Sequence, residues 1–216
     1  MKNAHALIIG ATGATGRELV NKLLLDDDFT QVSIFVRNAP TIKHKKLKIH
    51  EIDFKDLEKY KDKIKGDILF SALGTTKKDA GGKDQQYEID YTYQYKFAKI
   101  AAENGVANYS LVSSVGANAK SFFFYPKIKG ALEEAVKKLD FQQIAIFQPP
   151  MLIRQPDLMR DGEKSGIKIL NRLNKLGILK SQKPLAVEEL AEKMLKMAKT
   201  PSKEKTTTYL PKDLFS

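Results

Sequence analysis

Cysteine and tryptophan are absent from this chain of 216 residues, and histidine occurs only three times. Without cysteine there is no disulfide, no thiolate metal site and no cysteine nucleophile, which fits a reducing compartment. His5, His44 and His50 lack the spacing of metal ligands, so no metal is expected. No apolar run approaches the roughly 18 residues that a membrane-spanning helix needs, and the first residues carry no signal-peptide pattern. These absences predict a cytoplasmic protein without a membrane partner.

Acidic residues are fewer than basic ones, and the formal net charge is +11. The excess is mostly lysine and is spread along the chain. Its densest cluster, residues 43–48, has no interleaved aromatic side chains and is better explained as a solvated loop than as a nucleic-acid patch. No nucleic-acid partner is therefore expected. With 42% hydrophobic residues the chain has material for a packed core, so intrinsic disorder is excluded.

Apolar runs alternate with helix-length segments over the first two thirds of the chain. Strands are predicted at Ala4–Ile9, Val32–Val36, Leu47–Ile52, Ile68–Leu73, Tyr109–Ser113 and Ile144–Phe147. Helices are predicted at Thr15–Leu25, Gln85–Asn104 and Pro126–Leu139, with a charged helix or turn at Asp56–Lys65. This alternation is typical of right-handed βαβ units, so we expect an α/β fold with a doubly wound parallel sheet.

The pattern weakens after Pro150, where the chain is expected to form a loop up to Gly166. Two helices and a short strand are predicted there, at Ile167–Leu176, Val187–Ala198 and Thr206–Leu210. No repeat or low-complexity linker marks a boundary. We therefore expect one domain over residues 1–216, with a short C-terminal substrate-side region over about 150–216.

A glycine-rich turn, Gly10 to Gly16, joins the first predicted strand to the first helix. Gly10 permits a tight turn, Gly13 lets backbone N–H groups approach a pyrophosphate, and Gly16 allows close packing of the helix. The start of the helix adds the positive end of its dipole. The turn, with Thr12, Ala14 and Thr15, is therefore predicted to bind a dinucleotide; the alternative is a turn that binds nothing.

The ends of the next strands bear on which dinucleotide is bound. Arg37 follows the second strand, where an acidic residue would select NAD, and can pair with the 2′-phosphate of NADP. NADPH is therefore preferred over NADH, unless Arg37 is an ordinary surface arginine. Asp53, after the third strand, is placed to accept from the adenine amino group or is a solvated loop residue. Gly74, after Leu73, would let the cofactor lie against the backbone.

Tyr125 and Lys129 lie four residues apart at the start of a predicted helix, on one face. With eight tyrosines in a lysine-rich chain, about one such pair is expected by chance, and Tyr95 with Lys99 is a second example. Tyr125 differs because it follows a serine-bearing strand end by about a dozen residues. The pair at Tyr95 is interpreted as a core-facing tyrosine and a surface lysine.

Two serines, Ser113 and Ser114, end the strand that precedes Tyr125. A tyrosine hydroxyl can act as acid or base when a nearby ammonium favours its phenolate, and a serine hydroxyl can hold a substrate oxygen. This combination suits carbonyl reduction or its reverse, with Tyr125 as the acid and Lys129 as its partner. The sequence leaves open which serine acts, and it leaves the ordinary-helix explanation open as well.

Four motifs together carry a family resemblance: GATGATGR, LGTT, SSVGA and YPKIKG. They are similar to the short-chain dehydrogenase/reductase superfamily, in its atypical branch, and the chain most resembles the Tat-interacting-protein-like oxidoreductases. The resemblance implies a Rossmann fold and Tyr125 and Lys129 as the proton-transfer pair. It implies NADPH contacts from Thr12, Gly13, Ala14, Thr15, Arg37, Asn38, Leu73 and Gly74, from Leu152 beside the nicotinamide, and from Arg160.

Two positions depart from the family pattern. Asp90 stands where many members have an asparagine that supports a proton relay, and Gln148 stands where relatives often have arginine. We expect an NADPH-dependent oxidoreductase for a small carbonyl or alcohol substrate, with a dinucleotide-sensing regulator or scaffold as the alternative. Substrate identity, a protein partner and the oligomeric state are left open by the sequence.

Overall fold

A computed structural model describes residues 1–159, 162–175 and 183–215 of the chain. Within these residues, seven parallel strands form one sheet in the order β3-β2-β1-β4-β5-β6-β9. Their bounds are β1 Ala4–Ile9, β2 Phe29–Val36, β3 Leu47–Glu51, β4 Ile68–Ser71, β5 Asn108–Val112, β6 Gln143–Phe147 and β9 Thr206–Tyr209. The strand order changes direction at β1, as in Rossmann folds. The expected doubly wound parallel sheet is therefore confirmed.

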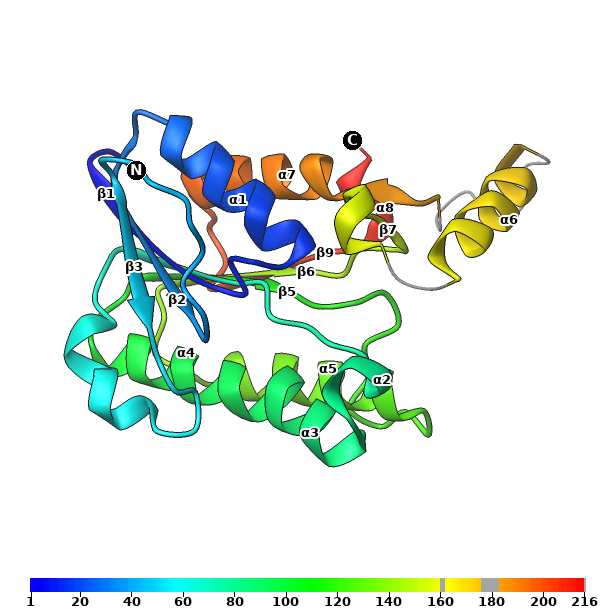
Figure 1. The fold of residues 1–216 in the computed structure, drawn as a ribbon, viewed down its shortest axis with the longest axis horizontal. Coiled ribbons are helices and arrows are strands. Elements are labelled where there is room, and N and C mark those ends of the chain that lie inside the picture. The colour runs from blue at the N-terminus through cyan, green and yellow to red at the C-terminus, as the bar shows by residue number, and fades with distance from the viewer. Residues whose placement is uncertain (160–161, 176–182, 216) are drawn as a thin grey trace.

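Helices cover both faces of this sheet (Figure 1). One face carries α1 and α7, and the other carries α4 and α5. Their bounds are α1 Ala14–Leu25, α7 Val187–Lys199, α4 Gln94–Glu103 and α5 Phe124–Val136. Shorter helices are the 3-10 helix η1 Leu57–Lys63, α2 Lys77–Ala80, α3 Lys83–Tyr87, the 3-10 helix η3 Pro156–Leu158 and α8 Pro211–Leu214. Two apolar clusters lie on the two faces, so the strands are buried from both sides.

The helix predicted at Gln85–Asn104 is interrupted by a π-helical turn, η2, at Glu88–Tyr93. A π turn moves the backbone hydrogen bonds from the fourth to the fifth residue. The side-chain amide of Gln94 supplies a donor instead: its Nε2 lies 2.8 Å from the Asp90 carbonyl oxygen. Its Oε1 accepts from Ser71 Oγ on β4, also at 2.8 Å. The sheet therefore holds the π turn in place, with the Asp90 side chain fully buried.

Other boundaries differ modestly from those predicted. Helix α5 begins two residues before Pro126, which is its third residue, where a backbone N–H has no intrahelical partner. Helix α6 spans Glu163–Lys175 and so begins four residues before the predicted Ile167. A two-stranded parallel sheet of β7 Leu152–Ile153 and β8 Leu185–Ala186 was not predicted, because each strand has only two residues. Across the described ranges, no helix is long and apolar enough to cross a bilayer.

Candidate functional site

The turn after β1 lies in close contact with the residue that follows β4. Gly10 has a φ of +79°, and a Cβ built there would lie 2.4 Å from the Ala72 carbonyl carbon. A Cβ on Gly16 would lie 2.0 Å from the Gly10 oxygen. Both distances are far below contact, so only glycine lets the start of α1 lie this close to the strand ends.

A first cavity of about 310 Å³ opens at this turn, and we call it the glycine-turn cavity. It is lined by Gly10, Thr12, Gly13, Arg37, Phe54, Ala72, Leu73, Gly74, Thr75, Asp79, Ala80, Ile89 and Tyr93. The cavity therefore brings together predicted residues from the ends of β1, β2 and β4.

Burial raises the pKa of the Tyr93 hydroxyl in this lining to about 12, helped by a hydrogen bond with Glu88, so it stays protonated near neutral pH. The glycine-bounded backbone, the start of α1 and the Arg37 guanidinium fit the phosphates of a dinucleotide.

The other predicted cofactor residues lie outside that lining. Ala14, Thr15 and Gly16 are buried in the first turn of α1. Asn38 and Asp53 are exposed, and Asp53 Oδ1 accepts a 2.9 Å hydrogen bond from the backbone N–H of Lys55. Their contacts with a cofactor stay predictions. Arg160 lies outside the described residues.

A second cavity, of about 390 Å³, lies at the ends of β5 and β6, and we call it the serine–tyrosine cavity. It is lined by Ser113, Ser114, Val115, Tyr125, Pro149, Pro150, Met151, Leu152, Arg154, Glu163 and Leu170. Both serines and Tyr125 therefore share one cavity, and Leu152 lies there and not at the glycine turn. Tyr125 is 40% exposed, so its side chain is only partly covered by the fold. Because β4 and β5 are parallel neighbours, both cavities lie along the same edge of the sheet.

Lys129 lines neither cavity and is instead buried next to Asp90. Its Nζ lies 3.9 Å from Asp90 Oδ1, and the two side chains are 3% and 0% exposed. The same Oδ1 accepts from the backbone N–H of Thr75 at 3.1 Å. Thr75 lines the glycine-turn cavity, and Lys129 is one helical turn from Tyr125. Asp90, held by the π turn, therefore links a residue of the glycine-turn cavity to the helix that carries Tyr125.

Glu133, which the sequence analysis did not identify, binds one of the two candidate serines. The Ser113 hydroxyl donates to Glu133 Oε1 in a short hydrogen bond. Gln148 Nε2 donates to both carboxylate oxygens at 3.0 Å. Burial raises the pKa of the Glu133 carboxyl, and these hydrogen bonds offset part of the effect. The available signal was spacing, because Glu133 continues the series of Tyr125 and Lys129 at four-residue steps.

Replacing Glu133 by glutamine is expected to make stability less sensitive to pH. A carboxyl whose pKa is raised by folding contributes stability that is fully present below its ordinary value of 4.5. That contribution is lost as the pH rises through the folded-state value. The free energy of unfolding of wild type, relative to Glu133→Gln, should therefore fall with increasing pH in urea titrations. A difference that is constant or rises with pH would contradict this assignment.

The second tyrosine–lysine pair forms no such site. The Tyr95 ring stacks on Tyr91, with centroids 6.0 Å apart, and Lys99 Nζ lies 3.8 Å from Glu103 Oε1. Tyr95 is partly buried against the core and Lys99 is exposed, as expected. Among the described residues, no group of three or more histidine, aspartate or glutamate side chains could hold a metal.

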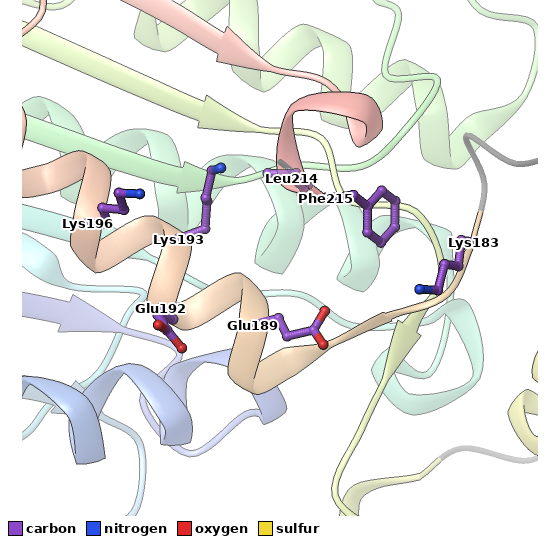
Figure 2. A pocket seen from close by; sticks show the side chains of 7 residues that line it. All are labelled: Lys183, Glu189, Glu192, Lys193, Lys196, Leu214 and Phe215. Carbon is purple, nitrogen blue, oxygen red and sulfur yellow. The ribbon is translucent and has the colours of Figure 1, made fainter.

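Another cavity, of about 590 Å³, lies between α7 and the C-terminal residues. Figure 2 shows its lining: Lys183, Glu189, Glu192, Lys193, Lys196, Leu214 and Phe215. Three lysines and two glutamates occur together here, and Lys183 Nζ lies 5.7 Å from the Phe215 ring centroid. This mixed-charge lining contains none of the predicted site residues, so we place the candidate site at the two cavities described above.

Comparisons with known proteins identify the family and support the fold. The model of a family described as NAD(P)H-binding matches residues 10–177. Protein HTATIP2 of Rattus norvegicus is 32% identical over 167 residues, which cover 76% of this chain and 69% of that protein. Protein FMP52-1, mitochondrial, of Scheffersomyces stipitis is 35% identical over 181 residues, 81% of this chain and 75% of that one. The Bordetella bronchiseptica enzyme WbmH, solved in complex with NAD+, has a TM-score of 0.70 at 14% identity, over 96% of this chain and 75% of that one, which supports the fold alone.

The expected cytoplasmic location is contradicted by these comparisons. Relatives from four fungi, at 32–36% identity, are named as mitochondrial proteins. The cytoplasmic expectation was based on the absence of cysteine, of long apolar runs and of a signal-peptide pattern, and none of these absences excludes a mitochondrial location.

Proposed function

We propose a function from one premise: this chain belongs to the NAD(P)H-binding family, as a homologue of HTATIP2 and FMP52 among the atypical short-chain dehydrogenase/reductases. The protein is an NADPH-dependent oxidoreductase that acts on a small carbonyl or alcohol compound. The residues of the glycine-turn cavity would hold the phosphates and adenosine of the cofactor. The serine–tyrosine cavity holds the substrate.

One observation carries this proposal. Tyr125, Ser113 and Ser114 share a cavity at the edge of the sheet where the glycine turn also lies. The buried Lys129 of the Lys129–Asp90 pair lies one helical turn from Tyr125. In open α/β sheets, ligands bind outside the carboxyl ends of the strands. A dinucleotide held at the glycine turn would therefore extend toward the hydroxyl groups that can exchange a proton with a substrate oxygen.

The chain's own residues supply the proton and the charge. A bound reduced nicotinamide would supply the hydride that adds to a carbonyl carbon. The Tyr125 hydroxyl donates its proton to the carbonyl oxygen, so that the products are an alcohol and a phenolate. The positive charge of Lys129, fixed by Asp90, stabilises that phenolate, which regains a proton from solvent through its exposed face.

NADPH is preferred over NADH in this proposal because of Arg37. Arg37 lines the glycine-turn cavity just after the end of β2. No acidic side chain occurs at residues 37–40, where one would repel a 2′-phosphate. An arginine can instead form two parallel hydrogen bonds with that phosphate.

Ser114 is the serine that orients the substrate. The Ser113 hydroxyl donates to the buried Glu133 carboxylate, so its proton is already used. Ser114 is only half-buried, and its hydroxyl donates to the adjacent Val115 carbonyl at 3.2 Å, a bond that a ligand can replace. Both side chains line the cavity, but only Ser114 can donate to a substrate oxygen without breaking a buried hydrogen bond.

The test is NADPH oxidation with a panel of small aldehydes and ketones, using wild type, Ser114→Ala and Ser113→Ala. Wild type should show a substrate-dependent rate, and Ser114→Ala should lower kcat about 10- to 100-fold at unchanged stability, because an oxyanion contact is lost. Ser113→Ala should instead lower the free energy of unfolding by about 1–3 kcal/mol, because Glu133 loses a buried donor. Reversed effects would transfer the role to Ser113, and no turnover with any compound would contradict the reductase proposal.

A further inference from the structure

The serine–tyrosine cavity contains two charged groups that the proposed reaction does not use, Arg154 and Glu163. Arg154 Nε lies 3.0 Å from Glu163 Oε1. The side chains are 20% and 18% exposed, so the pair is largely shielded from water. The rest of the lining is uncharged: three hydroxyl groups and a set of apolar side chains. The two charges therefore cancel, and the cavity has no net charge.

Helix α6 brings Glu163 to this position. Glu163 and Leu170, seven residues apart on α6, both line the cavity and lie on one face of the helix. Between them, a Cβ on Gly166 would lie 3.1 Å from the Met151 Cε. This face of α6 is therefore a wall of the cavity, although most of the helix projects from the body of the fold (Figure 1). Arg154 directly follows β7, so the pair joins α6 to the strand segment after β6.

An arginine in this cavity would attract anionic ligands unless a counter-charge neutralised it. The guanidinium group does not lose its proton in proteins, so only a counter-charge can neutralise it. A partly buried guanidinium beside three hydroxyl groups would bind a carboxylate or a phosphate through paired hydrogen bonds. Glu163 occupies that role and adds its own negative charge to the wall. An anionic substrate would thus find no available cation among the described residues of this lining.

We infer that the cavity selects uncharged, predominantly apolar carbonyl compounds, and that Glu163 determines this specificity by masking Arg154. The inference rests on the proposed function and specifies its substrate class. The apolar lining, which includes Val115, Pro149 and Leu170, favours a hydrocarbon substituent on the carbonyl carbon.

The test compares two compounds of nearly equal shape, diacetyl and pyruvate, which differ in a methyl group and a carboxylate oxygen. Wild type should reduce diacetyl with a kcat/KM about 100-fold or more above that for pyruvate, since the carboxylate gains no partner. Glu163→Gln keeps the size of the side chain and an oxygen acceptor, but leaves the Arg154 charge unmasked. We expect this variant to improve kcat/KM for pyruvate about tenfold or more relative to diacetyl.

The control is the double variant Arg154→Gln/Glu163→Gln, which removes both charges and should return the ratio to the wild-type value. If Glu163 had a purely structural role, its replacement would change kcat/KM for both compounds by the same factor, and the ratio of the two values would stay constant. An unchanged ratio in Glu163→Gln, or a gain that survives in the double variant, would overturn the inference.

A binding measurement separates this inference from the reductase proposal. Calorimetric titrations with benzoate and benzamide measure binding without turnover. These two compounds, like pyruvate and diacetyl, differ in one negative charge. Wild type should favour benzamide, Glu163→Gln should shift the affinity ratio toward benzoate about tenfold, and the double variant should reverse that shift. If no variant reduces diacetyl, pyruvate or any other compound of the panel, the reductase proposal fails, and the benzoate-to-benzamide ratio still decides the role of Glu163. A ratio that is the same in all three proteins would refute it.

Discussion

Replacing Tyr125 by phenylalanine is expected to lower kcat for carbonyl reduction by about 100- to 10,000-fold, the range typical of a lost general acid. The change removes only the hydroxyl, while the ring still packs at the start of α5. NADPH affinity should therefore stay within about twofold of wild type, because a group that acts in proton transfer is not needed for cofactor binding. Steady-state rates with the best carbonyl compound and a fluorescence titration with NADPH measure the two quantities on one preparation.

Tyr95→Phe is the matched control for this experiment. Tyr95 also has a lysine four residues later, but it stacks on Tyr91 away from both cavities. Its hydroxyl should be dispensable, so the rate should match that of wild type. If Tyr125→Phe keeps the wild-type rate, Tyr125 is not the acid. If neither protein turns over but both bind NADPH, the alternative of a dinucleotide-sensing regulator is favoured.

Replacing Lys129 by methionine is expected to cost both activity and stability. The Lys129 ammonium and the Asp90 carboxylate are buried together, and removing one partner of a buried pair typically costs about 3–5 kcal/mol. Turnover should be lost as well, because no cation then stabilises the Tyr125 phenolate. Urea unfolding measures the first effect, and NADPH oxidation measures the second.

The double variant Asp90→Asn/Lys129→Met separates the two effects. Asparagine keeps an oxygen that can accept from the Thr75 N–H. It is uncharged, so it needs no buried cation beside it. Much of the stability lost in Lys129→Met should therefore return, whereas the rate should not. The single variant Asp90→Asn completes the comparison. If the stability losses of Asp90→Asn and Lys129→Met simply add in the double variant, the pair is not coupled, and the structural basis for the position of Lys129 would be wrong.

The order of strands and helices was predictable because it depends on local patterns. Buried parallel strands appear as continuous apolar runs, and Gly10 and Gly16 stand where a tight turn and a close packing contact exclude a side chain. The tyrosine–lysine pair could be separated from its counterpart at Tyr95 by its position after a strand end. Each of these features is formed by residues that are close together in the sequence, so each can be recognised without knowing the fold.

Features that depend on long-range contacts were not predictable. The π turn around Asp90 depends on Gln94, whose side chain reaches Ser71 on β4. Glu133 would be an ordinary surface residue of an amphipathic helix if Ser113 and Gln148 did not meet it from other strand ends. The pairing of Arg154 with Glu163 depends in the same way on where α6 lies, and no local pattern specifies that position.

Binding of a dinucleotide at the glycine turn is tested most directly by titrating wild type, Arg37→Ala and Arg172→Ala with NADPH and with NADH. Arg172 is an exposed arginine on α6 outside both cavities and serves as the control. We predict NADPH binding on the order of micromolar in wild type and Arg172→Ala, weakened about 10- to 100-fold in Arg37→Ala, with NADH little changed throughout. Failure of both dinucleotides to bind wild type would make the glycine turn purely structural and would contradict the oxidoreductase proposal.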